Sequence, residues 1–389
     1  MSEQKKNVKL FIFVTAFYWF SMYAYIPTFS PYIESLGASH KMIGLILGSY
    51  GFTQMLIRIP LGIYSDRINK KKIFVNFGIL LSVISTIGMW FAETPALILI
   101  FRSLAGASAA TWVSFTVLFS SYFKDDDTAH AIGIINASNK SGQVVGMLLG
   151  GIIAQSLSQQ YPFLLAAAAG IVGFILSLKV DENKDIDHQA ITLKEIIKVA
   201  KNKSLLMVSF LAILMMMISH STSFGFIPVA AKNLGATSFH LGLLTTITTI
   251  PGILSSYLSG SYFSKRIGEK NTVTIGFSLL AISCILVPFV EKLYLLFFVQ
   301  MLNGFSQGMI FPVLMGLSIK NVRANKRGTA MGFFQAIYGL GMFIGPIFVG
   351  TISDFAGLKM GFWMIGLVGI LGAVLSRFYR AERVETKHI

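Results

Sequence analysis

Residues 62–72 read GIYSDRINKKK and lie between two apolar stretches, residues 41–63 and 73–92. Each stretch has the roughly 20 mainly apolar residues that a membrane-spanning helix needs. A carboxylate, an arginine and three lysines are therefore concentrated in a short loop between two predicted spans. This pattern of helix, basic loop and helix predicts an all-α membrane protein, and similar patterns recur along the chain.

The composition of the 389 residues also indicates a polytopic membrane protein. Hydrophobic residues make up 54% of the chain and charged residues only 13%, and the mean hydropathy is +0.69. A soluble domain carries about 25% charged residues, so too little polar surface is left here to cover a soluble globule. The composition therefore excludes a soluble enzyme, a disordered chain and a nucleic-acid-binding protein. The single Cys284 excludes a disulfide framework and a cysteine-based metal site.

Twelve stretches of the chain are long and apolar enough to cross a membrane. They are residues 10–29, 41–63, 73–92, 96–122, 130–155, 162–178, 204–230, 239–263, 272–290, 293–318, 328–352 and 359–378. The first is longer than the apolar part of a cleaved signal peptide, so we expect it to remain in the mature protein. An even number of spans places both termini on the same side of the membrane.

The distribution of Lys and Arg over the loops predicts which side that is. Of the 32 such residues, 25 fall on the side that holds both tails and the central loop, and 4 fall on the other side. We therefore expect both termini to be cytoplasmic, in a bacterial inner membrane. The net charge of +15 then reflects topology, and anionic lipid headgroups rather than nucleic acid are its expected partner.

The longest polar stretch, residues 179–203, lies in the middle of the chain. It separates an N-terminal bundle, residues 1–178, from a C-terminal bundle, residues 204–389, with six predicted spans each. Its second part, ITLKEIIKVAKNK, has the apolar spacing of an amphipathic helix lying at the membrane surface. A solvated linker is the alternative.

The two halves repeat each other at an offset of about 199 residues. Residues 65–68 match residues 264–267, and Gly106 matches Gly304. A row of glycines in the fifth span also recurs in the eleventh: Gly142, Gly146 and Gly151 correspond to Gly341, Gly345 and Gly350. Parallel six-helix repeats are an architecture of secondary transporters, which bind substrate near the midplane between the halves.

Three motifs stand at fixed places in this repeat. The first, G-x-x-x-D-R-x-G-R-K, is present as Gly62, Asp66, Arg67, Lys70 and Lys71, with Asn69 in place of the second glycine. The second, R-x-x-q-G, is present as Arg102 and Gly106 without the glutamine. The third, G-x-x-x-G-P-x-x-G-G, is present as Gly142, Gly146, Gly150 and Gly151, with Met147 in place of the proline; its copy, Gly341, Gly345 and Pro346, keeps the proline.

On these residues the chain resembles the major facilitator superfamily over essentially its whole length. The start, residues 26–37, looks like that of the drug:proton antiporter branch. The resemblance implies two pseudo-symmetric six-helix bundles, usually in a monomer, that rock around a central cavity.

The resemblance also gives the motifs expected roles. In the family, the carboxylate equivalent to Asp66 faces the start of the eleventh helix, where the helix dipole favours it. This predicts that Gly62, Asp66, Arg67, Lys70 and Lys71 form a latch between the halves on the cytoplasmic side; a purely topological charge cluster is the alternative. The glycines of spans 5 and 11 allow close helix packing, and control of leak between the halves is a second possible role.

The charges inside the spans are all positive. All 17 acidic residues fall in loops or near span ends, whereas Arg58, Arg102 and Lys140 lie within spans. Ionisable residues at such depth are functional candidates, and pairing with carbonyls or snorkelling to the headgroups is the structural alternative. Lys140 lies near the midplane, so we expect it to face the cavity.

A proton-coupled transporter also needs a group that binds protons. His220 is the only histidine well inside a span, and its ordinary pKa range suits a proton carrier. Glu34 and Arg102 are further candidates for coupling. His40 and His240 flank spans on the outer side at matching places in the two halves, and we expect them in loops.

Polar residues at interior depth are the candidates for the substrate site. They are Lys140, Arg102, Gln54, Tyr23, Asn136, Asn139, Gln143, Asn303, Gln307, Gln335 and Tyr338. A pocket that mixes aromatic and amide groups suits an amphipathic small molecule. The aromatic residues of the first span are either part of this lining or interfacial anchors that face lipid.

The charge balance favours one class of function. A cavity with cations and no mid-span carboxylate favours a neutral or anionic substrate, so we expect a secondary transporter that works by proton-coupled efflux. Uptake of an organic anion by symport or exchange is the runner-up. A membrane enzyme or sensor is a distant alternative, because no catalytic motif is present and no metal or cofactor is expected.

Overall fold

The computed structural model describes residues 3–68, 70–123, 127–182, 202–320, 322 and 327–378, which are helical apart from short turns. The helices of the N-terminal half are α1 (Glu3–Tyr23), α2 (Ile26–Ser35), α3 (His40–Ile68), α4 (Lys71–Phe91), α5 (Pro95–Ala110), α6 (Trp112–Ser120), α7 (Thr128–Ser156) and α8 (Tyr161–Leu178). Those of the C-terminal half are α10 (Lys203–Ser221), η2 (Thr222–Phe226), α11 (Ile227–Asn233), α12 (Ser238–Leu258), η3 (Ser259–Phe263), α13 (Ser264–Ile267), α14 (Glu269–Leu286), η4 (Val287–Phe289), α15 (Leu293–Lys320), α16 (Arg327–Ala356) and α17 (Leu358–Phe378). The predicted amphipathic helix of the linker lies outside the described residues.

These elements form the all-α fold with twelve membrane crossings that the sequence predicts. Five of the described crossings are built from consecutive helices rather than one. The first is broken at Ala24–Tyr25 and the seventh by the π-helical turn η2, and in each case the second residue of the next helix is a proline, Pro27 or Pro228. Proline lacks a backbone N–H, and is tolerated in the first turn of a helix where that donor is unused. The first crossing therefore reaches Ser35, beyond the predicted end at residue 29.

Eleven of the crossings meet the length and hydropathy of a membrane span when the described residues are searched. The remaining one is α7, whose 29 residues are long enough. Its inner half carries Asn136, Asn139, Lys140 and Gln143, which lower its hydropathy. The most polar crossing is thus one on which the sequence places four candidate site residues.

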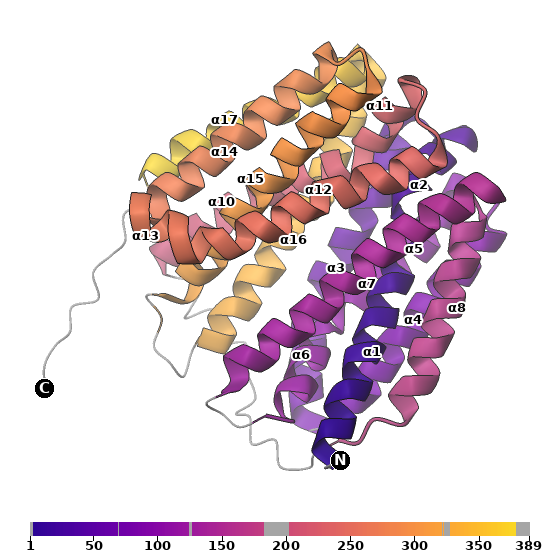
Figure 1. Ribbon diagram of the computed structural model, residues 1–389, viewed down its shortest axis with the longest axis vertical. Helices are drawn as coiled ribbons and strands as arrows, with labels where there is room; N and C mark the ends of the chain where they lie inside the picture. Colours follow the sequence, from indigo (N-terminus) through magenta and orange to yellow (C-terminus); the bar gives the residue numbers. More distant parts are fainter. Residues whose placement is uncertain are drawn as a thin grey trace, which may run out of the picture.

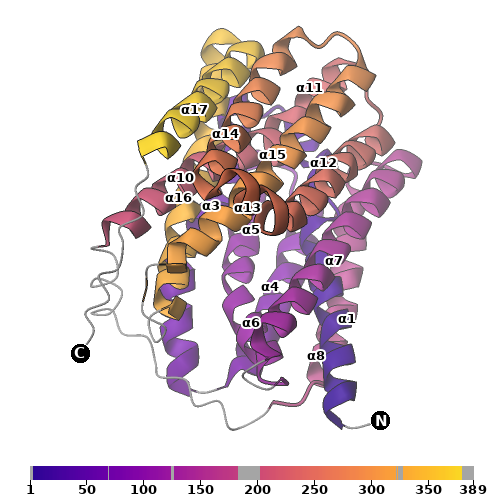
Figure 2. The same ribbon diagram turned by 60° about the vertical axis from the view of Figure 1, so that its left-hand side comes forward.

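The two halves share one packing plan (Figures 1 and 2). In the N-terminal half α1 packs on α7 and α8, α3 on α5, and α4 on α8. In the C-terminal half α10 packs on α16 and α17, α12 on α15, and α14 on α17, which are the equivalent pairs of the repeat. Between the halves, α3 packs along α16 and α7 along α12. The interface is therefore built mainly on two equivalent helix pairs of the repeat, and α2 adds contacts with η2, α11 and α12.

The buried core shows where the halves are joined. One cluster runs continuously from α2 and the first half of α3 into the C-terminal half, through residues such as Phe29, Ile43 and Phe226. A second cluster, around Phe11 and Phe115, fills the inner part of the N-terminal half. The halves consequently share a core on the predicted outer side and are more separate on the inner side.

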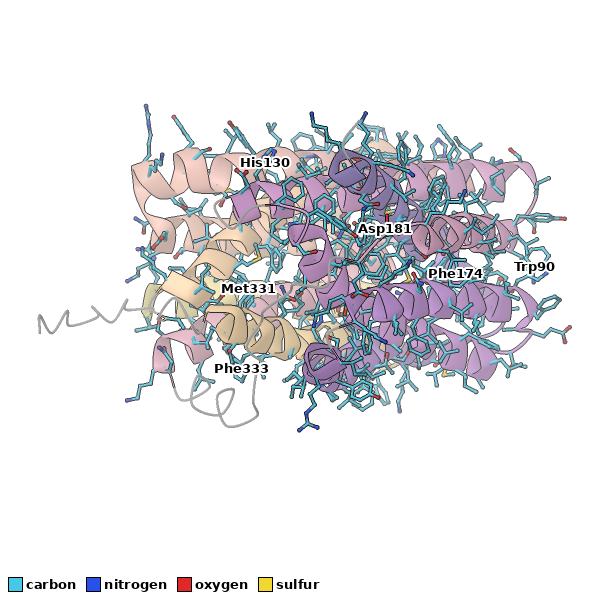
Figure 3. All side chains as sticks on the ribbon, turned by 90° about the horizontal axis from the view of Figure 1, so that it is seen from below. Trp90, His130, Phe174, Asp181, Met331 and Phe333 are labelled. Carbon is cyan, nitrogen blue, oxygen red and sulfur yellow. The ribbon has the colours of Figure 1, made fainter. Side chains whose placement is uncertain are left out.

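The outer part of the interface brings α3 and α16 into backbone contact. A Cβ added to Gly44 would lie 2.2 Å from the carbonyl oxygen of Pro346, and one added to Gly48 would lie 2.6 Å from that of Phe343. Toward the inner side the arrangement is open: His130, at the start of α7, and Met331, in the inner part of α16, lie well apart (Figure 3). The halves are thus closed together at the predicted outer ends and separated at the predicted inner ends (Figure 3).

Candidate functional site

Arg102 on α5 is buried in the N-terminal half, and aromatic rings enclose its guanidinium. The guanidinium carbon lies 4.4 Å from the ring centre of Tyr50, 5.3 Å from that of Phe29 and 5.6 Å from that of Tyr25. One terminal nitrogen donates to the Tyr25 hydroxyl at 2.5 Å, while Nε has no hydrogen-bond partner among the described residues. Aromatic faces attract a cation, but no carboxylate in the described part of the chain pairs with this one. Arg102 is a buried positive charge with unused capacity to bind an anion.

The same guanidinium borders a small cavity between the two halves. Its lining comes from α1, α2, α3 and α5 on one side and α10 and η2 on the other: Met22, Tyr23, Ile26, Tyr50, Arg102, His220 and Phe224. The cavity measures about 10 Å³, which is room for about one water molecule. A larger ligand must separate the halves here, beginning with Tyr23 and Phe224, whose ring centres are 5.8 Å apart.

His220 is the imidazole in this cavity lining. It lies in the last turn of α10, directly before η2, and its ring centre is 5.5 Å from that of Phe224. Its Nδ1 atom is buried and has no hydrogen-bond partner among the described residues. The fold thus brings three predicted site residues, Arg102, Tyr23 and His220, into one pocket.

Lys140 lies along α7, outside this pocket. Its Nζ donates to Oε1 of Gln143 at 3.3 Å, and the Gln143 amide donates to Oδ1 of Asn139 at 2.5 Å. Lys140 and Asn136 are exposed. They lie on the same face of α7 as Met147, which is two turns further along the helix and packs against α12. The polar part of α7 therefore forms a strip that faces the opposite half where the two halves have separated.

Arg58 connects two further predicted residues across the interface. Its Nη1 donates to Oε1 of Gln335 at 3.3 Å and to the Tyr338 hydroxyl at 3.5 Å, both on α16. Gln54 is buried one turn earlier on the same face of α3. Among the described residues this is the innermost hydrogen-bonded contact between the halves. It must change when the halves move.

Asn303 and Gln307 on α15 belong to a hydrogen-bonded network inside the C-terminal half. Oδ1 of Asn303 accepts from Gln307 at 2.6 Å and from Ser223 at 3.1 Å, and the Asn303 amide donates to Ser283 at 3.0 Å. Gln307 also accepts from Ser219 at 2.7 Å. Asn303 is buried while Gln307 is partly exposed. The geometry gives Asn303 a structural role and leaves Gln307 as the accessible member.

The comparison with known proteins agrees with this architecture. The sequence profile of the Major Facilitator Superfamily matches residues 11–218 and 209–389. The chain belongs to the major facilitator superfamily. Members of this superfamily and the structural neighbours are multi-pass membrane transporters, so the protein is a transporter and not an enzyme.

Relatives within the superfamily are distant in sequence but match over the whole chain. An uncharacterised MFS-type transporter of Methanocaldococcus jannaschii is 25% identical, over 98% of this chain and 100% of the relative. The quinolone resistance protein NorA of Staphylococcus aureus is 23% identical, over 92% of this chain and 94% of its own. The solved structure of a bacterial homologue of the human lysosomal transporter Spinster, inward-facing and occupied, is 14% identical with a TM-score of 0.82, covering 97% of each chain.

The superfamily glycine motif lies where helices touch. A Cβ on Gly142, Gly146 or Gly150 would approach the backbone of α1, and one on Gly151 would meet Gly242 of α12. In the repeat, Gly341 and Gly345 lie against the α10 backbone in the same way. The backbone of Pro346 is in close contact with Gly44 of α3. The residues of both copies fit close packing, and their role in leak control stays a prediction.

The superfamily loop motif after α3 lies at the open inner side. Arg67 and Lys70 are exposed, and a Cβ on Gly62 would meet open space. Lys71 is buried and its Nζ donates to the Ser65 hydroxyl at 3.1 Å. The Asp66 side chain and Asn69 lie outside the described residues. The predicted latch requires the inner ends to meet, so it stays a prediction for the opposite conformation.

Glu34 lies at the outer end of α2 beside His40, near a span end as expected, and its role in coupling stays a prediction. One outcome differs from the sequence predictions. His40 and His240 were expected in loops, but His40 begins α3 and His240 lies in the first turn of α12. Their helices start earlier because the polar first turn of each crossing projects beyond the apolar stretch from which its boundary was predicted.

The sequence analysis did not single out Tyr50 and Phe29, which enclose Arg102. A signal for Tyr50 was present: it precedes Gln54 and Arg58 at intervals of four residues, so all three share one face of α3. No comparable signal marks Phe29, because its ring reaches Arg102 only through the break between α1 and α2.

Proposed function

We propose that the protein exports a neutral or anionic amphipathic small molecule by alternating access, in exchange for protons, and that the substrate binds between the halves at Arg102, Tyr23 and His220. The observation that carries the proposal is the buried guanidinium of Arg102, which faces the inter-half cavity without a carboxylate partner among the described residues.

The charges along the interface support this substrate class. The ion pairs of the described residues lie at helix ends, between His40 and Glu34, His40 and Asp354, and Lys320 and Glu269. Arg58 and Lys140 add positive charge on the inner side of Arg102. A cation that entered from the inner side would meet like charges in a low-dielectric region, whereas an anion would be stabilised there. The strip of Asn136, Asn139, Lys140 and Gln143 adds hydrogen-bonding groups along the same path.

The proposed coupling group is His220, assisted by Arg102. A neutral substrate that fills the cavity excludes water from the imidazole and favours its neutral form. Substrate and proton then compete for the pocket, and competition of this kind is the requirement for exchange. The likeness to NorA, a quinolone resistance protein, supports export as the direction.

A second candidate is uptake of an organic anion together with a proton. His220 and Arg102 line the same cavity. If the bound anion lies against His220 rather than against Arg102 alone, it stabilises the protonated imidazole, and anion and proton enter together rather than in exchange. The direction in which protons move with the substrate therefore decides between exchange and symport.

One experiment tests both. The purified protein is reconstituted in liposomes with an internal pH dye, and aromatic carboxylates, neutral aromatic amides and the lipophilic cation tetraphenylphosphonium are added outside. We expect an anionic or neutral compound to drive proton flux. In exchange, protons leave the liposome as the substrate enters; in symport, protons enter together with the substrate. Arg102→Gln should lower the initial rate of this flux by about tenfold to a hundredfold, and Arg377→Gln, which removes an exposed cation at the end of α17, should leave it unchanged.

The outcome that contradicts the proposal is equally specific. Proton flux driven by tetraphenylphosphonium and unaffected by Arg102→Gln would show that the protein carries lipophilic cations, and that Arg102 has a structural role.

A further inference from the structure

The outer ends of α3 and α16 are joined by a carboxylate that caps a helix. Asp354, in the last turn of α16, accepts hydrogen bonds from the backbone N–H groups of His40 at 2.8 Å and Lys41 at 3.0 Å, in the first turn of α3. The first N–H groups of a helix have no partner within the helix, and the helix dipole favours a negative charge there. Because α16 and α3 belong to different halves, this cap ties the halves together on the predicted outer side.

The imidazole of His40 lies between two carboxylates. Its Nδ1 is 3.4 Å from Oδ1 of Asp354, and its Nε2 is 3.6 Å from Oε1 of Glu34, in the last turn of α2. A neutral imidazole has one N–H and one lone pair, whereas the protonated ring has two N–H groups. Only the protonated ring presents a donor to both carboxylates at once. The arrangement is therefore complete only when His40 carries a proton.

No positively charged side chain of the described elements around His40 contacts its imidazole. Glu34 faces it from α2, Asp354 from α16, and the uncharged ring of Phe226 from η2 at 6.0 Å, while the neighbouring Lys41 is exposed. The His40 and Asp354 side chains are each 27% exposed and that of Glu34 is 39% exposed. Protons from the outer solution can therefore reach the cluster without entering the central cavity.

The repeat supplies a neutral copy of the same contact. Gln155 stands 199 residues before Asp354, in the last turn of α7, and its Oε1 accepts the N–H of Ser238 at 3.1 Å in the first turn of α12. His240, the counterpart of His40, forms a capping box with Thr237 of its own half, in which its Nδ1 accepts the Thr237 N–H at 3.2 Å. The two inter-half caps are equivalent in position. The cap at α3 has a carboxylate and a histidine that lies between two carboxylates, whereas the cap at α12 has a neutral amide.

We propose that His40, Glu34 and Asp354 form a proton-binding site on the outer face, separate from the central cavity, whose protonation holds the outer side of the transporter closed. When the outer side opens, α3 and α16 must separate and His40 loses Asp354. The closed form therefore binds a proton at His40 more tightly than the open form does. Lowering the outer pH through the range in which an imidazole titrates, about 5 to 8, favours closure. Ordinary carboxyl groups titrate near pH 4, below that range, so the response is assigned to the histidine.

The test follows the separation of the outer ends and needs no substrate. Cysteines replace Ser158, after α7, and Glu291, before α15, which are exposed on the outer side of opposite halves, while native Cys284 is buried and stays unlabelled. Spin-label distances are measured in lipid nanodiscs at about pH 5.5 and about pH 8, on either side of the imidazole range. We expect the ratio of open to closed outer ends to rise about 1.5-fold to fivefold between these values, as for the loss of one partly exposed ion pair, that of His40 with Asp354.

Matched variants assign the response. His40→Gln should remove the pH dependence, and so should Asp354→Asn, whose single amide oxygen can still accept one of the two backbone hydrogen bonds. His240→Gln should keep the full response. Gln155→Ala should shift the ratio to the same extent at both pH values, because it weakens the neutral cap.

The result that overturns the proposal is a pH response that persists in both His40→Gln and Asp354→Asn, or its absence from the unsubstituted protein. Melting temperatures close to that of the unsubstituted protein confirm that each variant is folded. Because no transported molecule is added, a failure here is distinct from a failure of the proposed substrate class.

Discussion

Arg102 on α5 and Gln300 on α15 occupy the same position of the two repeats, four residues before Gly106 and Gly304. Arg102 is charged, enclosed by rings, and faces the cavity between the halves. Gln300 is fully buried, and neither its oxygen nor its nitrogen has a hydrogen-bond partner among the described residues. One position of the repeat therefore carries a charge in one half and a neutral amide in the other.

This difference shows how a symmetric scaffold acquires an asymmetric site. The C-terminal half holds its polar interior in a closed network around Asn303, which stabilises helix packing. The N-terminal half holds Arg102 without such a network of side chains. We infer that the N-terminal half supplies the charge for substrate recognition and that the C-terminal half supplies the coupling histidine and a neutral wall.

Replacing Arg102 by the glutamine found at the equivalent position, Gln300, should have the largest effect on transport. Arg102→Gln gives the N-terminal half the residue of the C-terminal half, and we expect the transport rate to fall by about tenfold to a hundredfold, the effect of losing one charge-assisted interaction. The measure is the initial rate of substrate-driven proton flux in liposomes at matched protein content. Arg102→Lys should restore it only in part, because an ammonium lacks the planar fork of donors. Full transport activity of Arg102→Gln would contradict the inference that the charge of the N-terminal half recognises the substrate.

A second prediction tests where the halves are alike. A Cβ on Gly142 would lie 2.2 Å from the oxygen of Ala16, and one on Gly341 would lie 2.2 Å from that of Ile213. Gly142→Ala and Gly341→Ala should therefore each destabilise the protein by about 1–3 kcal/mol, through the same overpacking of one helix pair. Melting temperatures in detergent measure this, with Gly62→Ala, which meets open space, as the control. Unequal losses would show that the scaffold is less symmetric than its sequence repeat.

A third prediction concerns the network of the C-terminal half. Asn303→Ala leaves Ser283, Ser223 and Gln307 without a shared partner, and should cost about 1–3 kcal/mol of stability. Asn136→Ala, at an exposed position of α7, is the control and should change the melting temperature little. If both substitutions reduce transport and neither changes stability, Asn303 belongs to the substrate site instead.

The smallest effect is expected at Gln300. Replacing a buried amide that lacks partners by an apolar side chain of similar size is nearly neutral or stabilising. Gln300→Leu should therefore leave the melting temperature equal or slightly higher, with transport retained. A clear loss of stability would show that Gln300 makes polar contacts that the described residues do not reveal.

The sequence predicted the fold well because membrane spans have a simple requirement. About 20 apolar residues and a basic loop identify a crossing whatever it packs against, and the glycine rows revealed the repeat. The breaks within crossings were not predicted. They depend on single residues, such as Pro27 and Pro228, whose effect on a helix depends on the turn in which they fall.

The candidate site could be predicted only in part, for a geometric reason. Residue type and depth identified Arg102, Tyr23 and His220, which the structure brings together. The same criteria also selected Asn303, which is satisfied within its own half, because depth alone does not give the direction of a side chain. The cluster of Glu34, His40 and Asp354 joins residues over 300 positions apart, and only the packing of α3 on α16 reveals it.

The glycines of α3 that meet α16 have a consequence for the cost of the transport cycle. Gly44 and Gly48 contribute no side chain to the outer seam, and they meet backbone atoms of Pro346 and Phe343. Ordering a glycine at an interface freezes no rotamers, so closure along this seam carries little side-chain entropy loss. Opening of the seam likewise regains little side-chain entropy. The contacts of this seam are therefore little offset by side-chain entropy, and the polar contacts at the helix ends, each of modest strength, adjust the balance between the open and the closed form.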